Sequence, residues 1–102
     1  MFTLAITPAS ALPGYDPFKY IAVFYSTSYR VSKVVPFGNV HEEDYTQHQD
    51  HEKRMKYVKE HDWEKGHYSD GMHPRTLNRF ILYKYPHVDV AVEKYKRKFN
   101  YN

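Results

Sequence analysis

The chain of 102 residues has no cysteine, only four glycines and a single tryptophan. The lack of cysteine excludes disulfide bonds, thiolate metal ligands and a cysteine nucleophile. No segment approaches the roughly 18 consecutive apolar residues of a membrane-spanning helix, so we expect none. The first residues carry no basic segment ahead of their apolar side chains, so a secretory signal is not expected either. The glycines are isolated, which excludes a glycine-rich phosphate loop.

What the chain does contain favours one folded domain. Hydrophobic residues make up 41% and aromatic residues 18%, with 11 tyrosines and 6 phenylalanines, whereas disordered chains are poor in these residues. The net charge of +3 is unevenly spread: residues 41–73 hold five basic and nine acidic groups, and residues 74–102 hold seven and two. An acidic middle followed by a basic end favours contacts with several different surfaces. A nucleic-acid-binding protein more usually has one dominant basic surface.

Residues 1–18 are predicted to form an extended N-terminal arm. Pro8, Pro13 and Pro17 fix the backbone and remove amide donors, so a continuous helix or strand is not expected there. The segment is nevertheless too apolar for a free tail, and we expect it to dock either on its own domain or on a neighbouring subunit. The arm residues that could bind a partner are Phe2, Leu4, Ile6, Leu12 and Tyr15.

Residues 19–102 are predicted to form a small single α+β domain, a β-hairpin followed by three helices. Residues 20–25 are rich in β-branched and aromatic side chains, and residues 29–35 alternate in polarity, which together are typical of paired strands. Pro36 is expected to end the second strand, because it cannot donate to a ladder. Phe37-Gly38-Asn39 would then form the turn towards the first helix.

Three helices are expected after that turn. Over residues 44–62, Thr46 and Gln49 fit the spacing of an N-cap and its N3 partner, and Asp50 and Arg54 fit an i, i+4 ion pair. A short helix over residues 74–84 would be stopped by Pro86. A last helix is predicted from about Val88 to Phe99, where apolar residues follow the clearest 3.6-residue period of the chain.

Candidate chemistry is sparse. His48 and His51 are three residues apart on the first predicted helix, and Asp44 lies four residues before His48, so either pair could share a face and bind a metal. However, Met55 stands where a His-Glu-x-x-His motif needs its second histidine, and no Gly-x-Ser-x-Gly string occurs. A small metal-dependent enzyme is therefore the weakest reading, and we expect no enzyme activity, no cofactor, no metal and no small-molecule substrate.

Nucleic-acid binding is the stronger alternative. The basic residues of the last quarter could pair with phosphates while tyrosines stack on bases; they are Arg75, Arg79, Lys84, Lys94, Lys96, Arg97 and Lys98. Tyr95 and Phe99, however, lie on the apolar stripe of the last predicted helix, where a place in the core explains them better.

A family resemblance adds a functional expectation. The string Asp44-Tyr45-Thr46-Gln47-His48-Gln49-Asp50, together with Phe37-Gly38 before it, resembles a family of small proteins of nucleocytoplasmic large DNA viruses, including chlorella-virus and giant-virus types. The resemblance covers about residues 20–99 and continues through Arg54, Tyr57, His61, Trp63, Leu77, Arg79, Ile81, Pro86, Tyr95 and Phe99. The chain departs from the family at His41-Glu42-Glu43, where a Gly-Tyr pair is usual.

The resemblance implies a non-enzymatic virion protein, a minor capsid or cement component made in the host cytoplasm. Its partners would be the major capsid protein and other minor capsid proteins, bound by the arm and by Arg75, Lys96, Arg97 and Lys98. The alternative is a virion nucleic-acid-binding protein that uses the basic C-terminal segment. The motif residues would then be structural: Thr46 a helix cap, Asp50 a partner of Arg54, and Phe37-Gly38 a turn. The shared core would comprise Trp63, Leu77, Phe80, Ile81, Val92 and Tyr95.

Overall fold

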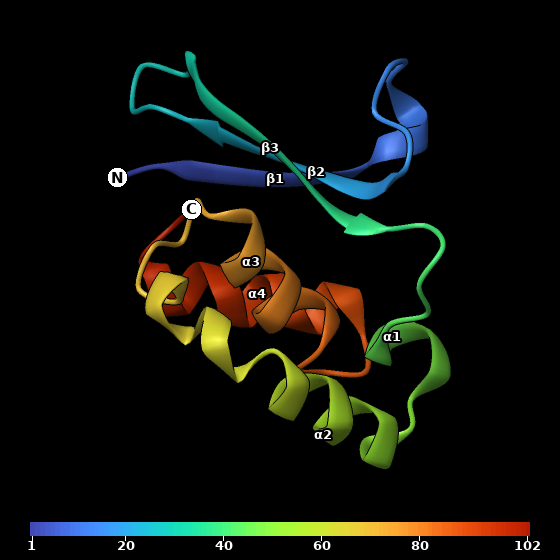
Figure 1. Ribbon diagram of the computed structural model, residues 1–102. Helices are drawn as coiled ribbons and strands as arrows, with labels where there is room; N and C mark the ends of the chain where they lie inside the picture. The colour runs from blue at the N-terminus through green and yellow to red at the C-terminus, as the bar shows by residue number, and fades with distance from the viewer.

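Three antiparallel strands form a sheet, and helices pack against one of its two faces (Figure 1). The computed structural model describes residues 1–102. The strands are β1 (Thr3–Pro8), β2 (Phe18–Tyr25) and β3 (Val31–Asn39), in the spatial order β1-β2-β3. A short 3-10 helix, η1 (Ala9–Ala11), follows β1. After the sheet come α1 (Tyr45–His48), α2 (His51–Glu60), the 3-10 helix η2 (Asp62–His67), α3 (Pro74–Leu77), the π-helical turn η3 (Asn78–Leu82) and α4 (Val88–Phe99). The α+β class predicted from the sequence is confirmed.

The first half of the predicted arm is a strand of this sheet. Residues 3–8 pair with β2 over the whole length of β1, so the expectation that residues 1–18 hold no continuous strand is wrong. Pro8 is tolerated because it is the last residue of a strand at the edge of the sheet. The chain end lies beside β1: the amide of Leu4 donates to the carbonyl oxygen of Asn102 at 2.8 Å, and the amide of Asn102 donates to that of Phe2 at 2.9 Å. This segment therefore docks on its own domain.

The predicted hairpin is present, but its second strand is longer than expected. β3 continues through Pro36 to Asn39, so Pro36 does not end it and Phe37-Gly38-Asn39 is not a turn. β3 is the other edge strand, where a missing amide need not break a ladder bond. Phe37 is buried in the core. Gly38 has φ +77, and a Cβ there would lie 2.9 Å from Cδ1 of Leu82, so this position suits glycine alone.

The single helix predicted over residues 44–62 is two helices. Gln49 adopts a left-handed conformation, φ 52, and ends α1. Asp44, not Thr46, is the N-cap of α1, with Gln47 as its N3 partner in a complete capping box. Asp50 is the N-cap of α2 and accepts from the amides of Glu52 and Lys53. The capping role predicted for Thr46 is therefore wrong by two positions.

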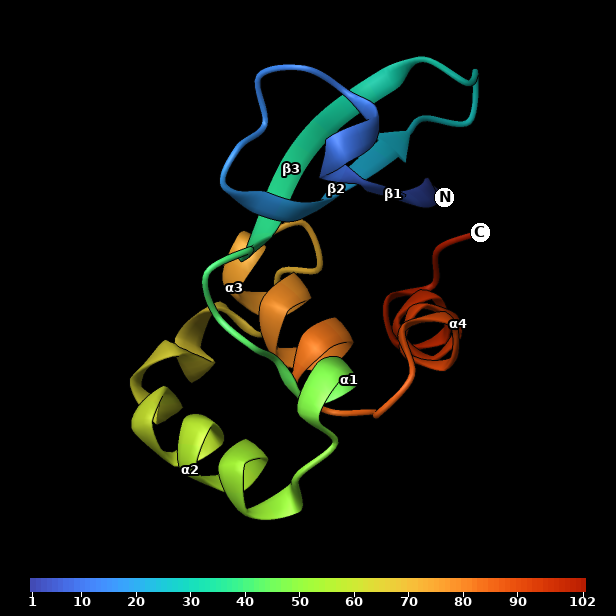
Figure 2. The ribbon, with the colours of Figure 1, turned by 90° about the vertical axis from the view of Figure 1, so that its right-hand side faces the viewer.

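The last two helical predictions hold better. The segment predicted over 74–84 is α3 followed by η3, and it ends at Leu82, before Pro86. α4 spans Val88–Phe99 as predicted. Figure 2 shows α2 and α4 on opposite sides of the α3–η3 segment, all of them on the same side of the sheet.

The core lies between the sheet and the α3–η3–α4 segment. It comprises Leu4, Ala22, Phe24, Val35, Phe37, Leu77, Ile81, Leu82, Tyr83, Ala91 and Tyr95. The hydroxyl of Tyr95 donates to the backbone oxygen of Gly71 at 2.5 Å and so satisfies the one polar end of a fully buried ring. Trp63, which was expected in the core, is 65% exposed; this expectation is wrong. None of the helices combines the length and the hydropathy that a bilayer crossing requires.

Candidate functional site

A buried ion pair joins the sheet to the first helix. Nζ of Lys19, on β2, lies 2.6 Å from Oδ2 of Asp44 and donates also to Oε1 of Gln47 at 2.6 Å. The side chains of Lys19 and Asp44 are only 10% and 2% exposed. The other carboxylate oxygen of Asp44 accepts from the amide and the hydroxyl of Thr46. Every polar atom of this carboxylate is thus engaged, which makes the pair a latch between β2 and α1.

A shallow hollow of about 340 Å³ lies beside this latch, lined partly by Pro8, Asp16 and Phe18. The latch residues Lys19 and Asp44 form part of its wall, and they are already bonded to each other. Two of the three charged groups that line this hollow are therefore occupied in holding β2 to α1.

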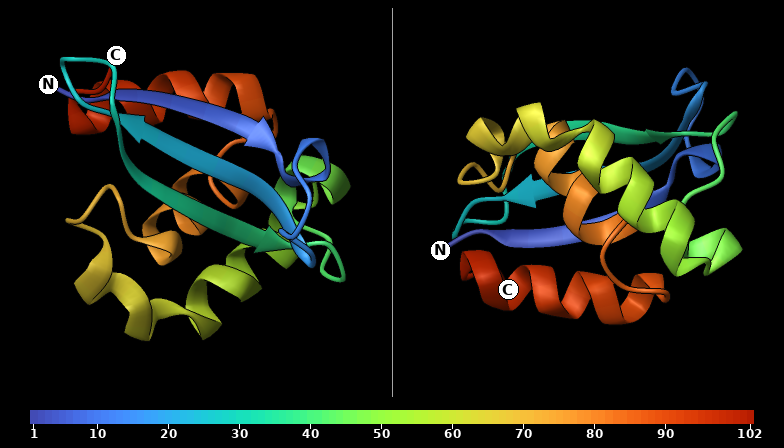
Figure 3. Two further views of the ribbon diagram at one scale, coloured as in Figure 1. Left: turned by 90° about the horizontal axis from the view of Figure 1, so that it is seen from above. Right: turned by 60° about the horizontal axis from the view of Figure 1, so that its bottom comes forward.

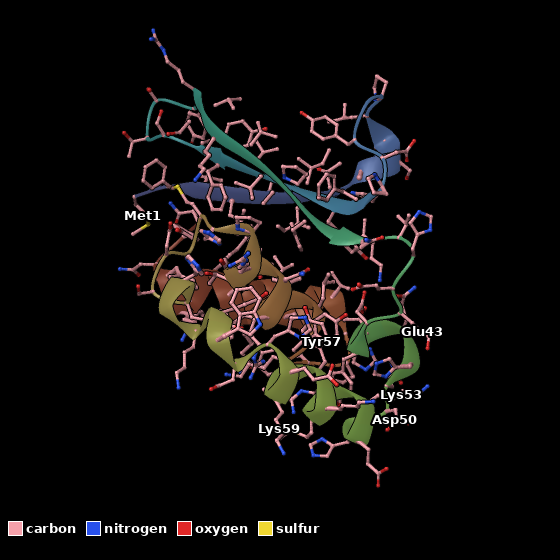
Figure 4. All side chains as sticks on the ribbon, in the orientation of Figure 1. Met1, Glu43, Asp50, Lys53, Tyr57 and Lys59 are labelled. Atoms are coloured by element: carbon pink, nitrogen blue, oxygen red, sulfur yellow. The ribbon has the colours of Figure 1, made fainter.

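An aromatic stack ties α2 to the segment after η3. The rings of Tyr57 and Tyr83 are parallel, with centroids 3.5 Å apart, and His61 stacks on the other side of Tyr57 at 3.8 Å. Burial raises the pKa of both tyrosines. Negative charge nearby raises the two pKa values further, with Glu42 acting on both phenols. Tyr57 faces a second hollow that Glu43 and Lys53 also line (Figure 4). The phenols here are held neutral and serve as packing surfaces.

The predicted pair between Asp50 and Arg54 does not form. Oδ1 of Asp50 caps α2, whereas Nε of Arg54 donates to the backbone oxygen of Tyr83 at 2.7 Å, and its guanidinium lies 5.4 Å from the ring centroid of Tyr45. Arg54 therefore fastens α2 to the residue after η3.

The histidines and carboxylates of residues 41–73 come together at most in pairs, such as the stacked rings of His67 and His73, whose centroids are 4.2 Å apart. No group of three such side chains is close enough to hold a metal ion. Nδ1 of His48 accepts from the amide of Asp50 at 2.9 Å, and His51 is exposed. Neither histidine shares a site with Asp44, whose carboxylate belongs to the latch.

The outer face of the sheet, opposite the helices, is only partly covered. Ala22 and Phe24 point into the core, so their neighbours Val23 and Tyr25 point outward. They pair across the strands with Val34 and Val31 of β3, which are 40% and 59% exposed. Figure 3 shows this face from above, with the η1 segment over one end only. We call Val23, Tyr25, Val31 and Val34, together with Tyr29 at the hairpin tip, the outer face.

Tyr29 is the most prominent residue of this surface. Its side chain is 81% exposed, and its backbone lies in the left-handed region with φ 59. A bulky residue with positive φ is uncommon, because its Cβ crowds the backbone. The hairpin thus presents an aromatic ring to solvent at some conformational cost.

The residues that the sequence predicts to bind a partner lie outside this surface and are scattered. Leu4 is buried in the core of its own domain, while Phe2, Ile6 and Tyr15 are half-buried and Leu12 is 45% exposed. Arg75 lies over the exposed ring of Trp63, 4.6 Å from its centroid. Lys96 is half-buried and Arg97 exposed, whereas Lys98 lies 4.7 Å from the ring centroid of Phe80. Of the arm residues predicted to bind a partner, only Leu12 is well exposed.

The comparisons add a family of unknown function. The model of that family, DUF5754, matches residues 17–61, the stretch from β2 to the end of α2, so the chain is similar to it over that stretch. No curated protein and no solved structure matches the chain. Both members of the latch, Lys19 and Asp44, lie inside the matched stretch.

Sequence reasoning missed Lys19, Gln47 and Tyr29. Gln47 could have been found, because Asp44 and Gln47 show the same N-cap-to-N3 spacing as the pair that was chosen. Lys19 is 25 residues from its partner and gives no local signal. The pattern around Tyr29 predicts a strand and gives no signal for an exposed ring at a turn.

Proposed function

We propose that the protein is a non-enzymatic structural component of a virus particle, a minor capsid or cement protein that binds larger capsid proteins. The family resemblance of residues 20–99 supplies the viral setting. The partners would be the major capsid protein and other minor capsid proteins, and the protein would be located in the virion after synthesis in the host cytoplasm.

The outer face is the observation that supports this proposal most directly. In a two-layer α+β domain the helices cover only one face of the sheet. Here the other face carries Val31 and Val34 on an edge strand and Tyr29 at the tip of the hairpin. Exposed apolar patches of this kind mark protein–protein contacts, and tyrosine is enriched among the residues that dominate binding energy. A cement protein needs such a surface, because it is held by its neighbours and not by a ligand.

The proposal is tested on purified particles of the virus that encodes the protein. The protein should sediment with shells from which the DNA has been removed. Added back as purified protein, the variant Val34→Ser should bind depleted shells more weakly than the original, because its methyl groups leave the interface. Tyr29→Asn should do the same, and asparagine tolerates the positive φ of this position.

Val90→Ser is the matched control. Val90 is 41% exposed, as against 40% for Val34, but it lies on α4, away from the outer face. It should bind shells like the original protein. Absence from DNA-free shells, or equal binding by the Val34 and Val90 variants, would contradict the proposal.

Nucleic-acid binding within the virion is the second candidate. One observation favours it: several basic side chains around Phe80 have no acidic partner. A protein with this role would leave the particle with the DNA, whereas a cement protein would stay with the shell.

A further inference from the structure

Three basic side chains surround one aromatic ring on the helical side of the molecule. Cζ of Arg79 and Nζ of Lys84 lie 5.3 Å and 5.2 Å from the ring centroid of Phe80, and Nζ of Lys98 lies 4.7 Å from it. They come from η3, from the residues just after it and from α4. Chain segments distant in sequence therefore bring like charges to one place.

Arg54 adds a fourth charge. Its Nε is fixed on the backbone oxygen of Tyr83, next to Lys84 in the chain. Its positive charge acts on both Arg79 and Lys84, and each of these has a pKa lowered first by burial and then by neighbouring cations. We call Arg54, Arg79, Lys84 and Lys98, with Phe80 among them, the basic cluster.

No carboxylate balances the basic cluster. The four ion pairs of the molecule use Lys19, Lys56, Lys65 and Arg75, none of which belongs to it. Nη1 of Arg79 is buried and has no hydrogen-bond acceptor, so the guanidinium is not neutralised from inside the protein. Holding like charges together without an anion is unfavourable, and a bound anion would relieve this repulsion.

We propose that the basic cluster binds phosphate groups. Lys84 and Lys98 are exposed and offer a phosphate mobile point charges on flexible stems. Arg79 and Arg54, which are half-buried, add positive charge behind them. Phe80, half-buried, offers a ring on which a nucleobase can stack if the phosphates belong to a single strand. This inference is independent of the capsid role, and it gives the nucleic-acid candidate a definite place, centred on Phe80 and not on the residues 94–97.

The test uses the full chain and two probes, inorganic phosphate and a short single-stranded oligothymidylate. Phosphate should shift the amide NMR signals of Arg79, Lys84 and Lys98, and the oligonucleotide should shift the same signals at lower concentration. The affinity for the oligonucleotide should fall with salt with a log–log slope of about −0.7 for each phosphate contacted. The variant Lys84→Gln/Lys98→Gln should reduce the slope by about 1.4 units and weaken binding about tenfold or more.

Arg30→Gln/Lys33→Gln is the control, because it removes the same charge from two exposed residues at the hairpin. It should leave the slope and the phosphate-induced shifts unchanged. Shifts with phosphate alone would assign the site to free phosphate, and shifts with the oligonucleotide alone would assign it to nucleic acid; both support the proposal. Equal weakening by the two double variants, or no shift at the cluster with either probe, would overturn it. Neither result bears on sedimentation with DNA-free shells.

Discussion

Replacing Asp44 by alanine should lower the free energy of unfolding by about 4–6 kcal/mol. The carboxylate has two roles, and both are lost. Removing one member of a buried ion pair costs about 3–5 kcal/mol, because the other charge stays buried without a partner. Losing an N-cap costs about 1 kcal/mol more. The burial of both side chains, 10% exposed for Lys19 and 2% for Asp44, places this pair in the buried class and not among the weak surface pairs.

A loss of this size approaches the whole stability of a small domain, about 5–15 kcal/mol, so milder variants are needed as well. Asp44→Asn keeps a side-chain oxygen for the amide of Thr46 but removes the charge, and it should cost about 3 kcal/mol. Lys19→Met removes the cation and keeps an apolar stem. The double variant should cost less than the sum of the two single variants by about 1–3 kcal/mol, because no unpaired charge is left buried.

Urea unfolding, followed by circular dichroism, measures these differences. Asp50→Asn is the control: Asp50 is also an N-cap, but its carboxylate has no ion-pair partner, so the change should cost under about 1 kcal/mol. The reasoning is refuted if Asp44→Asn costs no more than Asp50→Asn, or if the effects of Lys19→Met and Asp44→Asn simply add.

Two further predictions concern Gly71 and the buried tyrosines. Gly71→Ala should lower the free energy of unfolding by about 1–3 kcal/mol, measured by thermal unfolding, because a Cβ there would lie 2.6 Å from Oη of Tyr101. Gly66→Ala is the control: a Cβ at this position meets nothing within 4 Å, so the change should be neutral or slightly stabilising. The protein should also lose stability as the pH rises above about 10, where a tyrosine in the unfolded chain ionises. Burial raises the pKa of Tyr95, Tyr57 and Tyr83 in the folded state. The unfolded chain therefore binds fewer protons than the folded one in this pH range, and unfolding becomes more favourable as the pH rises. Each such tyrosine contributes a fall of up to about 1.4 kcal/mol per pH unit, so Tyr95→Phe should flatten the alkaline slope by up to that amount; an unchanged slope would contradict the assignment.

The helices show where sequence patterns suffice. α4 was predicted correctly because its apolar residues repeat without interruption from Val88 to Phe99. The break between α1 and α2 was missed because it depends on one residue, Gln49, in a left-handed conformation that its side chain does not favour. Two capping aspartates, Asp44 and Asp50, six residues apart, were the available signal for two helix starts.

The strands show how proline can mislead. Pro8 argues from the sequence against a continuous strand in residues 1–18, and Pro36 predicts the end of a strand, yet both residues lie within strands. Proline is compatible with an edge strand, and a three-stranded sheet has two edges, so most of this small sheet tolerates it. Local composition does not show which strands lie at the edges of a sheet. Whether Pro8 and Pro36 are compatible with a strand therefore becomes clear only from the assembled sheet.

The candidate sites depend still more on tertiary structure. The latch joins residues 25 positions apart, and the basic cluster joins three segments around Phe80. The sequence showed that residues 74–102 are basic, but not that Arg75 would stack on Trp63 while Arg79 and Lys98 converge elsewhere. The same limit explains the wrong prediction for Trp63. The sequence does not show that this residue lies in the 3-10 helix η2, where its side chain is 65% exposed.

The stretch similar to the family of unknown function carries the latch but not a complete core. Residues 17–61 supply β2, β3, α1 and α2, with Phe24 and Phe37 pointing into the helical layer. The residues that cover those rings, Leu77, Ile81 and Tyr95 among them, lie beyond it. A chain that shares only this stretch must cover the same sheet face with other segments, because buried aromatic surface left in water is costly. The latch lies wholly within the matched stretch. The basic cluster takes only Arg54 from that stretch, because Arg79, Phe80, Lys84 and Lys98 lie beyond it.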